Sequence, residues 1–582
     1  MKRLTLLLGV LVATLLTSAL AQNSDTYVHQ VFGEWDTLDP VNAYDTASGL
    51  VIENVYETLY TYQGDSITEY EPALATGYEI SDDNLTYTYT LRDGVTFHSG
   101  NDFTCADVEY SIERALVTNP GDSGAWILME PLTGYYSNVA SELGEDATDE
   151  DYAAAWETIS GSVECVDDTT VQFNLAQVDP AFFVKMMFYA AAIVDRDWAI
   201  DNGMWDGTEA TWREWVGVDL REYYLHDHVS GTGAYRIVNA EPTTVVAEAF
   251  GDYWGDAPSV QNVLIQVVDE ESTRLLALQQ GDADRITVNS WATIESQVRG
   301  LPGVVIHEDP SWTSLTVGAI HFVQDIELED NPNVGSGQLD GNGIPADFFA
   351  DENIRLAFAQ SFNQDAFIEQ LYVGNGSKLT MALPPSFLGY NEDLPVYSYD
   401  PEAAEEAFRA AFDGDVWENG FELTITYNTG NTTRQTIAEI LKQNIEVLNP
   451  NFTINVRGIQ WPDFLASRQA QREPVSIVGW VPDYADPDNY IYTFYHSNGY
   501  YGELLAYENP EMDALIEEAR AITDSERRAE IYREVGQIGY EDVPFLTYPT
   551  QQAFIVTGES VDGIYYNPML SGQFLWKDIS KN

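Results

Sequence analysis

The sequence predicts a mixed α/β protein with two or more lobes. Its 582 residues exceed the length that a single hydrophobic core usually supports. Hydrophobic residues make up 45% of the chain, so it has enough apolar surface for more than one core. Strand-like and helix-like patterns alternate along most of the chain, which is typical of α/β lobes.

The first clear pair of elements is a strand over 85–91 and a helix that begins after Thr104. Apolar residues alternate with threonine over 85–91, which predicts a strand with one buried face. Thr104, with Asp107 three residues later, is a helix-capping pair, and the apolar residues of 108–116 fall on one helical face. The alternation continues with strand 262–268, helix 271–280, helix 401–412, helix 437–448 and strand 452–456.

The first 21 residues have the pattern of a secretory signal peptide. Two basic residues precede an apolar run over 4–16, and small residues lead to a cleavage position after Ala21. An uncleaved membrane anchor is the alternative, but polar residues follow at once over 22–25. No cysteine lies near the cleavage position, and no later segment is apolar and long enough to span a bilayer. We therefore expect export to the periplasm or extracellular space, without a lipid anchor or membrane insertion.

The net charge limits the partners of the protein. The chain has 94 acidic and 26 basic residues, a formal charge of −68. Such a surface repels nucleic acid and anionic lipid, so neither is expected as a partner. It suits a salty medium in which counter-ions screen self-repulsion, and it is only weak evidence for a cationic ligand.

Metal and cofactor patterns are weak. Cys105 and Cys165 fit either a disulfide in an exported chain or two small buried side chains, and no zinc-binding cysteine spacing is present. His226 and His228 would point to one side of an extended segment, but no third ligand is evident and a plain loop is favoured. The Gly/Asn/Asp-rich segment 325–347 lacks the ligand positions of a calcium loop. We expect no cofactor.

The sequence gives no specific support for an enzyme. The Gly-Ser-Gly triplet 335–337 lacks the flanking strand and helix of a nucleophile elbow, and no HExxH or phosphate-binding loop is present. A glycosidase needs two carboxylates at a fixed distance, but among 94 acids neighbouring pairs carry little information. We expect no catalytic residues.

One short stretch concentrates charge beside apolar bulk. The segment 479–494, GWVPDYADPDNYIYTF, places Asp483, Asp486 and Asp488 among tryptophan and tyrosine side chains. Charge in apolar surroundings is costly unless it is compensated. The segment has four alternative interpretations: a turn, a metal site, an acid/base pair and a binding site for a cation.

A series of segments resembles the extracytoplasmic solute-binding proteins of the oligopeptide/dipeptide/nickel class, which are the capture subunits of ABC importers. These segments are 71–116, 228–238, 252–255, 272–284, 353–363, 399–408 and the opening of 479–494. The resemblance implies a two-lobed, periplasmic-binding-protein-like fold with an additional subdomain on the first lobe and a ligand cleft between the lobes. It implies a first lobe formed by 22–288 and 554–582, and a second lobe formed by 289–553.

The resemblance also implies ligand contacts. Asp483 matches the aspartate that takes the α-amino group of a peptide, while a turn accounts better for Asp486 and Asp488. The other expected ligand-binding residues are Gly479, Trp480 and Tyr484 near this aspartate, and Tyr44, Thr46 and Ser48 from a segment that borders the cleft. Arg434, Arg468 and Arg472 are candidates, by location alone, for holding a peptide carboxylate.

The expected function is capture of di- or oligopeptides and their delivery to a membrane permease and its ATPase subunits, by a protein that acts as a monomer and not as an enzyme. Relatives of this class also take oligosaccharides and metal chelates, so these cargoes are alternatives, and a secreted hydrolase is a weaker one. Cys105 stands where the class more often has a small residue, which favours a local disulfide.

Overall fold

The computed structural model describes residues 25–121, 123–144 and 146–582. The expected signal peptide, 1–21, lies outside the described residues. Within them, no helix has the length and apolar character that crossing a bilayer requires.

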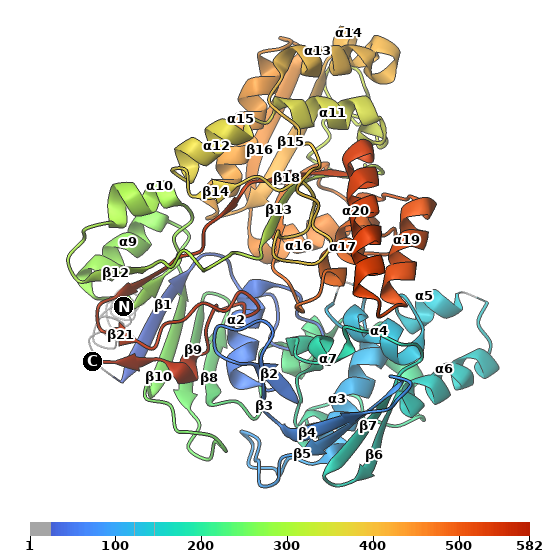
Figure 1. The fold of residues 1–582 in the computed structure, drawn as a ribbon, viewed down its shortest axis with the longest axis vertical. Helices are drawn as coiled ribbons and strands as arrows, with labels where there is room; N and C mark the ends of the chain where they lie inside the picture. The colour runs from blue at the N-terminus through green and yellow to red at the C-terminus, as the bar shows by residue number, and fades with distance from the viewer. Residues whose placement is uncertain (1–24, 122, 145) are drawn as a thin grey trace, which may run out of the picture.

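The structure is two-lobed and α/β, as expected, and each lobe is organised by one large sheet (Figure 1). The seven-stranded sheet of lobe one has the order β12-β20-β11-β1-β10-β9-β8. Its strands are β1 (Thr26–Val31), β8 (Tyr235–Glu241), β9 (Thr244–Ala249), β10 (Asn262–Val267), β11 (Arg285–Ile286), β12 (Val304–His307) and β20 (Ile555–Gly558). The central strand β1 runs parallel to both of its neighbours, β10 and β11.

Lobe two contains a five-stranded sheet with the order β16-β15-β17-β13-β18. Its strands are β13 (Val317–Phe322), β15 (Phe421–Asn428), β16 (Phe452–Ile459), β17 (Val475–Trp480) and β18 (Phe545–Tyr548). The strands β15, β16 and β17 are parallel, so their carboxyl ends lie at one edge of the sheet. Helix α15 (Thr432–Glu446) makes the crossover between β15 and β16.

A separate four-stranded sheet, with the order β4-β5-β7-β6, forms the additional subdomain on lobe one. It consists of β4 (Ala75–Ile80), β5 (Thr86–Leu91), β6 (Val163–Asp167) and β7 (Thr170–Asn174). Helix α3 (Cys105–Thr118) begins with the expected Thr104–Asp107 capping box. A disulfide joins Cys105 at the start of this helix to Cys165 on β6.

The chain passes from the first large sheet to the second between β12 and β13, and returns before β20. The strand β12 pairs with β20 in the sheet of lobe one, so residues 304–307 are hydrogen-bonded to the first lobe. We therefore propose that lobe one extends past the expected boundary at Val288 and that the outgoing crossover lies between His307 and Val317. The expected return at Phe554 adjoins the start of β20.

Candidate ligand-binding cleft

A cavity of about 120 Å³ lies between the two lobes, and it is called the central cavity below. Lobe one contributes Tyr44, Asp45, Thr46, Phe188, Tyr189, Met569 and Ser571 to its lining. Lobe two contributes Thr316, Arg434, Trp461, Leu465, Arg468, Tyr500, Tyr501 and the run 478–483.

Three parallel strands of lobe two deliver side chains to this cavity from the segments that follow their carboxyl ends. Arg434 follows β15, Trp461 follows β16 and Asp483 follows β17. In open α/β sheets the crevice outside the carboxyl ends of the strands is the usual place for a ligand. The strand order thus explains how residues 49 positions apart along the chain, such as Arg434 and Asp483, line one cavity.

Asp483 is held in place by an amide and a phenol. The Asn489 side chain donates to Asp483 Oδ2 over 2.9 Å, and its own oxygen accepts from the backbone N–H of Asp483 over 3.0 Å. The Tyr44 hydroxyl, from lobe one, donates to the same Oδ2 over 2.9 Å and accepts from Trp126 Nε1 over 2.8 Å. Side chains from both lobes therefore fix the position of the Asp483 carboxyl group.

No described basic side chain forms an ion pair with Asp483, although its side chain is only 7% exposed. Burial raises the pKa of this carboxyl to about 7, and the hydrogen bonds from Asn489 and Tyr44 only partly oppose the rise. A positive group that entered the central cavity would stabilise the ionised form.

The two neighbouring acids differ from Asp483 because each has a cation. Asp486 pairs with Arg528 over 2.5 Å, and its Oδ1 also accepts from the backbone N–H of Asp488 over 2.9 Å. Asp488 lies 3.2 Å from Arg520 and 3.7 Å from Lys185. Burial opposes ionisation of Asp488, but Arg520 and Lys185 outweigh it and lower its pKa. These two acids stabilise the structure, which agrees with the turn expected there.

Asp45 also lines the cavity, but it caps a helix. Its Oδ1 accepts from the backbone N–H groups of Ala47 and Ser48 at the start of α2 (Thr46–Val55), and from Trp461 Nε1 over 3.0 Å. The last bond joins the two lobes. The helix-start motif therefore accounts for one of the two oxygens of Asp45.

Arg434 is the cationic counterpart of Asp483 in the cavity. Its Nη1 donates to Asn428 Oδ1 over 2.8 Å, its buried Nε has no partner, and it forms no ion pair with any described residue. Gly479 faces it, because a Cβ there would lie 3.4 Å from Arg434 Nη2. Arg468 also lines the cavity and donates to His321 and Ser476. Arg472 donates to the Asp330 carbonyl and is absent from the lining.

The central cavity brings together most of the expected ligand-binding residues, but not all of them. Gly479, Trp480, Asp483, Tyr44 and Thr46 line the central cavity. Two other expected ligand contacts, Ser48 and Tyr484, are not among its lining residues.

The Ser48 and Tyr484 side chains are both fully buried and hydrogen-bonded within the protein. Ser48 Oγ accepts from the backbone N–H groups of Asp36 and Thr37. The Tyr484 hydroxyl donates to Asp488 Oδ2 over 3.0 Å. In this structure both side chains are therefore used in bonds within the protein.

Sequence reasoning missed Asn489, which positions Asp483, and several residues that enclose the cavity. Asn489 stands inside the acidic stretch, and its amide is the type of group that orients a carboxylate, but nothing local distinguished it. Trp461 begins α16 (Trp461–Gln469), and only the strand order reveals that it faces the cleft.

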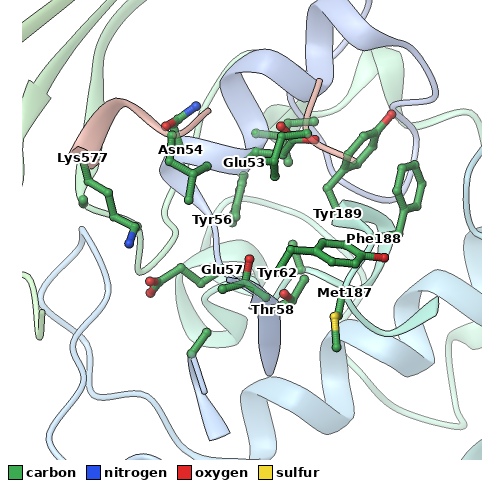
Figure 2. A pocket seen from close by; sticks show the side chains of 18 of the residues that line it. Glu53, Asn54, Tyr56, Glu57, Thr58, Tyr62, Met187, Phe188, Tyr189 and Lys577 are labelled. Carbon is green, nitrogen blue, oxygen red and sulfur yellow. The ribbon is translucent and has the colours of Figure 1, made fainter. Parts of the chain in front are cut away.

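A second chamber, of about 90 Å³, is lined by residues of lobe one and by Asp483 of lobe two. It shares Asp483, Phe188, Tyr189 and Met569 with the central cavity. Figure 2 shows three charged side chains that line it, Glu53, Glu57 and Lys577. Burial raises the pKa of Glu53 to about 7, against hydrogen bonds from Ser571. The chamber therefore extends the acidic end of the cleft beyond Asp483.

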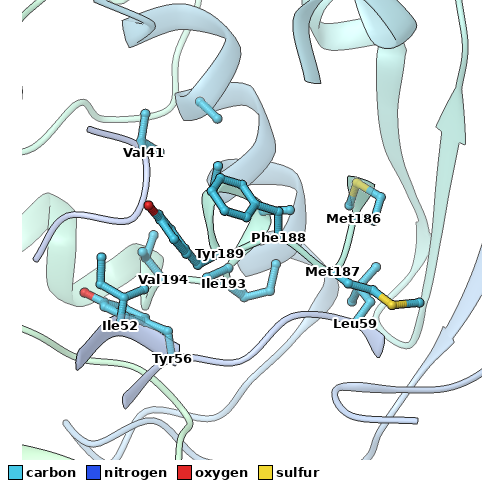
Figure 3. Packing of buried hydrophobic residues seen from close by; sticks show 14 of the residues in the cluster. Val41, Ile52, Tyr56, Leu59, Met186, Met187, Phe188, Tyr189, Ile193 and Val194 are labelled. Atoms are coloured by element: carbon cyan, nitrogen blue, oxygen red, sulfur yellow. The ribbon is translucent and has the colours of Figure 1, made fainter. Parts of the chain in front are cut away.

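The wall shared by these two spaces packs against the buried core of lobe one. Figure 3 shows Phe188 and Tyr189 packed with Ile52, Tyr56 and other buried residues of lobe one. The rings of Tyr44 and Phe188 meet edge to face with centroids 6.1 Å apart. This packing holds Tyr44 toward Asp483.

Comparisons with known proteins agree with this architecture. The family model of the bacterial extracellular solute-binding proteins, family 5 Middle, matches residues 69–502, which is more than half of the chain. Heme-binding protein A of Haemophilus influenzae is 26% identical over 524 residues, covering 89% of this chain and 85% of that protein. The dipeptide-binding protein of Escherichia coli is 25% identical over 519 residues, covering 86% and 85%.

A solved structure shares the fold. It is the periplasmic binding protein DppA of Helicobacter pylori in complex with the peptide STSA, with a TM-score of 0.74 and 22% identity, over 96% of this chain and 98% of that one. The resemblance seen in the sequence segments is thus confirmed at the level of family and fold. The chain belongs to the bacterial extracellular solute-binding proteins of family 5.

Proposed function

We propose that this protein captures peptides in the central cavity and delivers them to an ABC importer. The observation that carries the proposal is the pair of unmatched charges in one cavity. Asp483 has no cationic partner and Arg434 has no acidic partner among the described residues. A peptide brings an α-ammonium group for the first and an α-carboxylate for the second, and both bonds are charge-assisted.

The names of the relatives point to more than one cargo, and the cavity charges favour the peptide. One relative is a heme-binding protein and another a dipeptide-binding protein. Heme carries two carboxylates and no ammonium group, so it would leave Asp483 uncompensated. A neutral oligosaccharide would leave the charges of both Asp483 and Arg434 uncompensated. A cationic metal chelate would leave the charge of Arg434 uncompensated.

The remaining parts of the proposal concern location and partners. We infer export by the signal peptide 1–21, and action as a monomer that binds and releases cargo without chemistry. The membrane permease and ATPase subunits of the importer are the inferred partners. The family membership supports the extracellular location, because the family is one of extracellular solute-binding proteins.

Isothermal titration calorimetry with Ala-Ala and N-acetyl-Ala-Ala tests the proposal. Acetylation removes the positive charge, so it should weaken binding at least tenfold, because losing one partner of a buried charged pair costs about 2–5 kcal/mol. Asp483→Asn should weaken binding of Ala-Ala by a similar factor. The matched control is Asp340→Asn in an exposed loop, which should leave affinity unchanged.

Three results would contradict peptide capture. The first is equal affinity for the free and the acetylated peptide. The second is binding of a neutral oligosaccharide that Asp483→Asn leaves intact, which would favour the sugar alternative. The third is steady release of cleaved product by the purified protein, which would indicate a hydrolase.

A further inference from the structure

A third chamber, of about 250 Å³, adjoins the central cavity and is called the arginine chamber below. It shares Thr46, Arg434, Trp461 and Ser571 with the central cavity, but not Asp483. Its other walls are β1, β10, β11 and helix α2 of lobe one. At roughly 30 Å³ per water molecule, its volume equals about eight waters, so it can hold a polar side chain.

The floor of this chamber holds an unsatisfied histidine. His29 lies on β1 opposite Arg285 of β11, and it is 3% exposed. Neither of its ring nitrogens has a hydrogen-bond partner. Burial, reinforced by the charges of Arg285 and Arg274, lowers its pKa well below the ordinary value, so the ring is neutral. A neutral imidazole offers one donor and one acceptor, and leaving both unused in a buried site is costly.

Two guanidinium groups share the chamber without a counter-charge. Arg285 is 8% exposed and donates to the Gly572 carbonyl and, over 2.6 Å, to Gln573 Oε1, but it forms no ion pair with any described residue. Arg434 contributes the buried Nε that has no partner. None of the described residues that line the chamber is acidic, although 94 of the 582 residues of the chain are Asp or Glu.

This lining selects for negative charge. Uncompensated guanidinium groups in a buried site favour an anion, and a carboxylate matches the forked donor geometry of arginine. Arg434 lines both spaces, so the carboxyl end of a peptide held at Asp483 and Arg434 would lie beside the arginine chamber.

We propose that the arginine chamber is a subsite for a second anionic group of the cargo, namely the carboxylate of an acidic side chain at or near the C-terminal end of a bound peptide. The inference rests on the proposed function and narrows it. It assigns Arg285 and His29 as specificity-determining residues and makes acidic peptides the preferred cargo.

The test is calorimetry of the protein with Ala-Glu and its neutral isostere Ala-Gln, at one fixed salt concentration. The wild type should bind Ala-Glu at least tenfold more tightly than Ala-Gln. The Arg285→Gln variant should bind the two peptides within about twofold of each other. The control variant Arg236→Gln removes an exposed arginine that pairs with Glu248 on the same sheet, and it should keep the wild-type ratio.

A second variant keeps the test decisive if Arg285→Gln does not fold. Gln573→Glu replaces a single non-hydrogen atom and places a carboxylate beside Arg285, where the amide oxygen already accepts a hydrogen bond. This internal counter-ion should abolish the preference for Ala-Glu while the melting temperature is maintained or raised. Ala-phosphoserine serves as a further arm, because tighter binding of this peptide than of Ala-Glu would replace carboxylate with phosphate as the preferred anion.

The outcomes separate the two proposals. Similar affinities of the wild type for Ala-Glu and Ala-Gln would overturn the anion subsite and leave peptide capture intact. A preference for Ala-Glu that survives in both Arg285→Gln and Gln573→Glu would also overturn it. Failure of every peptide to bind would overturn the proposed function, and the subsite with it.

Discussion

The hydroxyl of Tyr44 donates a hydrogen bond to Asp483 Oδ2 over 2.9 Å, across 439 positions of sequence and between the two lobes. The bond places a neutral donor on a carboxylate that has no cationic partner among the described residues. It thereby keeps one oxygen satisfied while the negative charge stays uncompensated. The relationship explains how a buried carboxylate can persist at the cleft without being neutralised by the protein itself.

Replacing Tyr44 with Phe should therefore weaken peptide binding. The variant removes the hydrogen bond to Asp483 and orphans Trp126 Nε1, which now donates to the hydroxyl. A hydrogen bond to a charged group contributes about 1.5–3 kcal/mol, so affinity should fall at least tenfold. Calorimetry with Ala-Ala measures the effect, and Tyr399→Phe, at an exposed tyrosine, is the control. Unchanged affinity in Tyr44→Phe would show that the bond does not orient Asp483 for the ligand.

Removal of the charge at Asp483 should stabilise the ligand-free protein at pH 8. The pKa of this carboxyl is about 7 in the folded protein and 3.8 as its ordinary value, so folding favours the protonated form. Stability from this group is fully present below about pH 4 and is lost as the pH rises through 7. Three pKa units correspond to roughly 4 kcal/mol at most. Thermal unfolding should show Asp483→Asn to be more stable than wild type at pH 8, and the difference in stability should decrease toward pH 4. A difference that does not change with pH would contradict the raised pKa of Asp483.

Peptide binding should pass through a maximum between about pH 7 and pH 8. Below pH 7 the carboxyl of Asp483 takes up a proton, and above pH 8 the peptide amine loses one, so the ionic bond weakens on both sides. Binding at pH 7 should also release a fraction of a proton, because the ammonium group lowers the pKa of Asp483. Calorimetry in buffers with different ionisation enthalpies measures this release. Affinity that stays flat from pH 6 to about 9.5 would argue against an ammonium–Asp483 contact.

Arg434→Gln should remove the discrimination between a peptide acid and its amide. In wild type, Ala-Ala should bind at least tenfold more tightly than Ala-Ala amide, because only the acid provides a charge-assisted partner for the guanidinium group. The variant should bind both forms with similar affinity. Arg472→Gln, at an arginine outside the cavity lining, should behave as wild type. If wild type and Arg434→Gln discriminate equally between the acid and the amide, another residue holds the peptide carboxylate. Arg468, which also lines the cavity, would be the next residue to test.

Replacing both cysteines with alanine should cost stability without affecting the cleft. The disulfide closes a loop of 60 residues within the additional subdomain, and such a cross-link contributes about 2–4 kcal/mol. Neither Cys105 nor Cys165 lines the central cavity. Thermal unfolding should show a lower melting temperature, while calorimetry should give the wild-type affinity. A large loss of affinity in this variant would mean that the subdomain contributes to cargo binding.

Local patterns in the sequence predicted individual elements well. The threonine-alternating segment 85–91 forms β5, and the capping pair at Thr104 starts α3 as expected. The helix expected over 401–412 ends as an α-helix at Ala410, since Phe412 and Asp413 adopt positive φ angles that break it. Short-range periodicity and capping are sufficient for such elements, because the forces that define them act within a few residues.

The site was less predictable than the fold elements, because its charges are compensated by residues that are distant in sequence. Three acids within six residues look alike in sequence, and only the fold shows that Arg528 and Arg520 compensate two of them. The resemblance to a known class pointed to Asp483, whereas composition could not, with 94 acids in the chain. Local geometry matters as well: adjacent side chains in a turn point in different directions, and the Tyr484 hydroxyl turns back to Asp488.

The position of β20 bears on how the protein matures. This strand comes from the last thirty residues, yet it inserts between β11 and β12 and pairs with both. Until the tail arrives, β11 and β12 present open edges with unmet backbone groups, which invite association between chains. The large sheet of lobe one therefore becomes complete only when the last part of the chain has been synthesised, and truncation before Ile555 should yield aggregates rather than a smaller receptor.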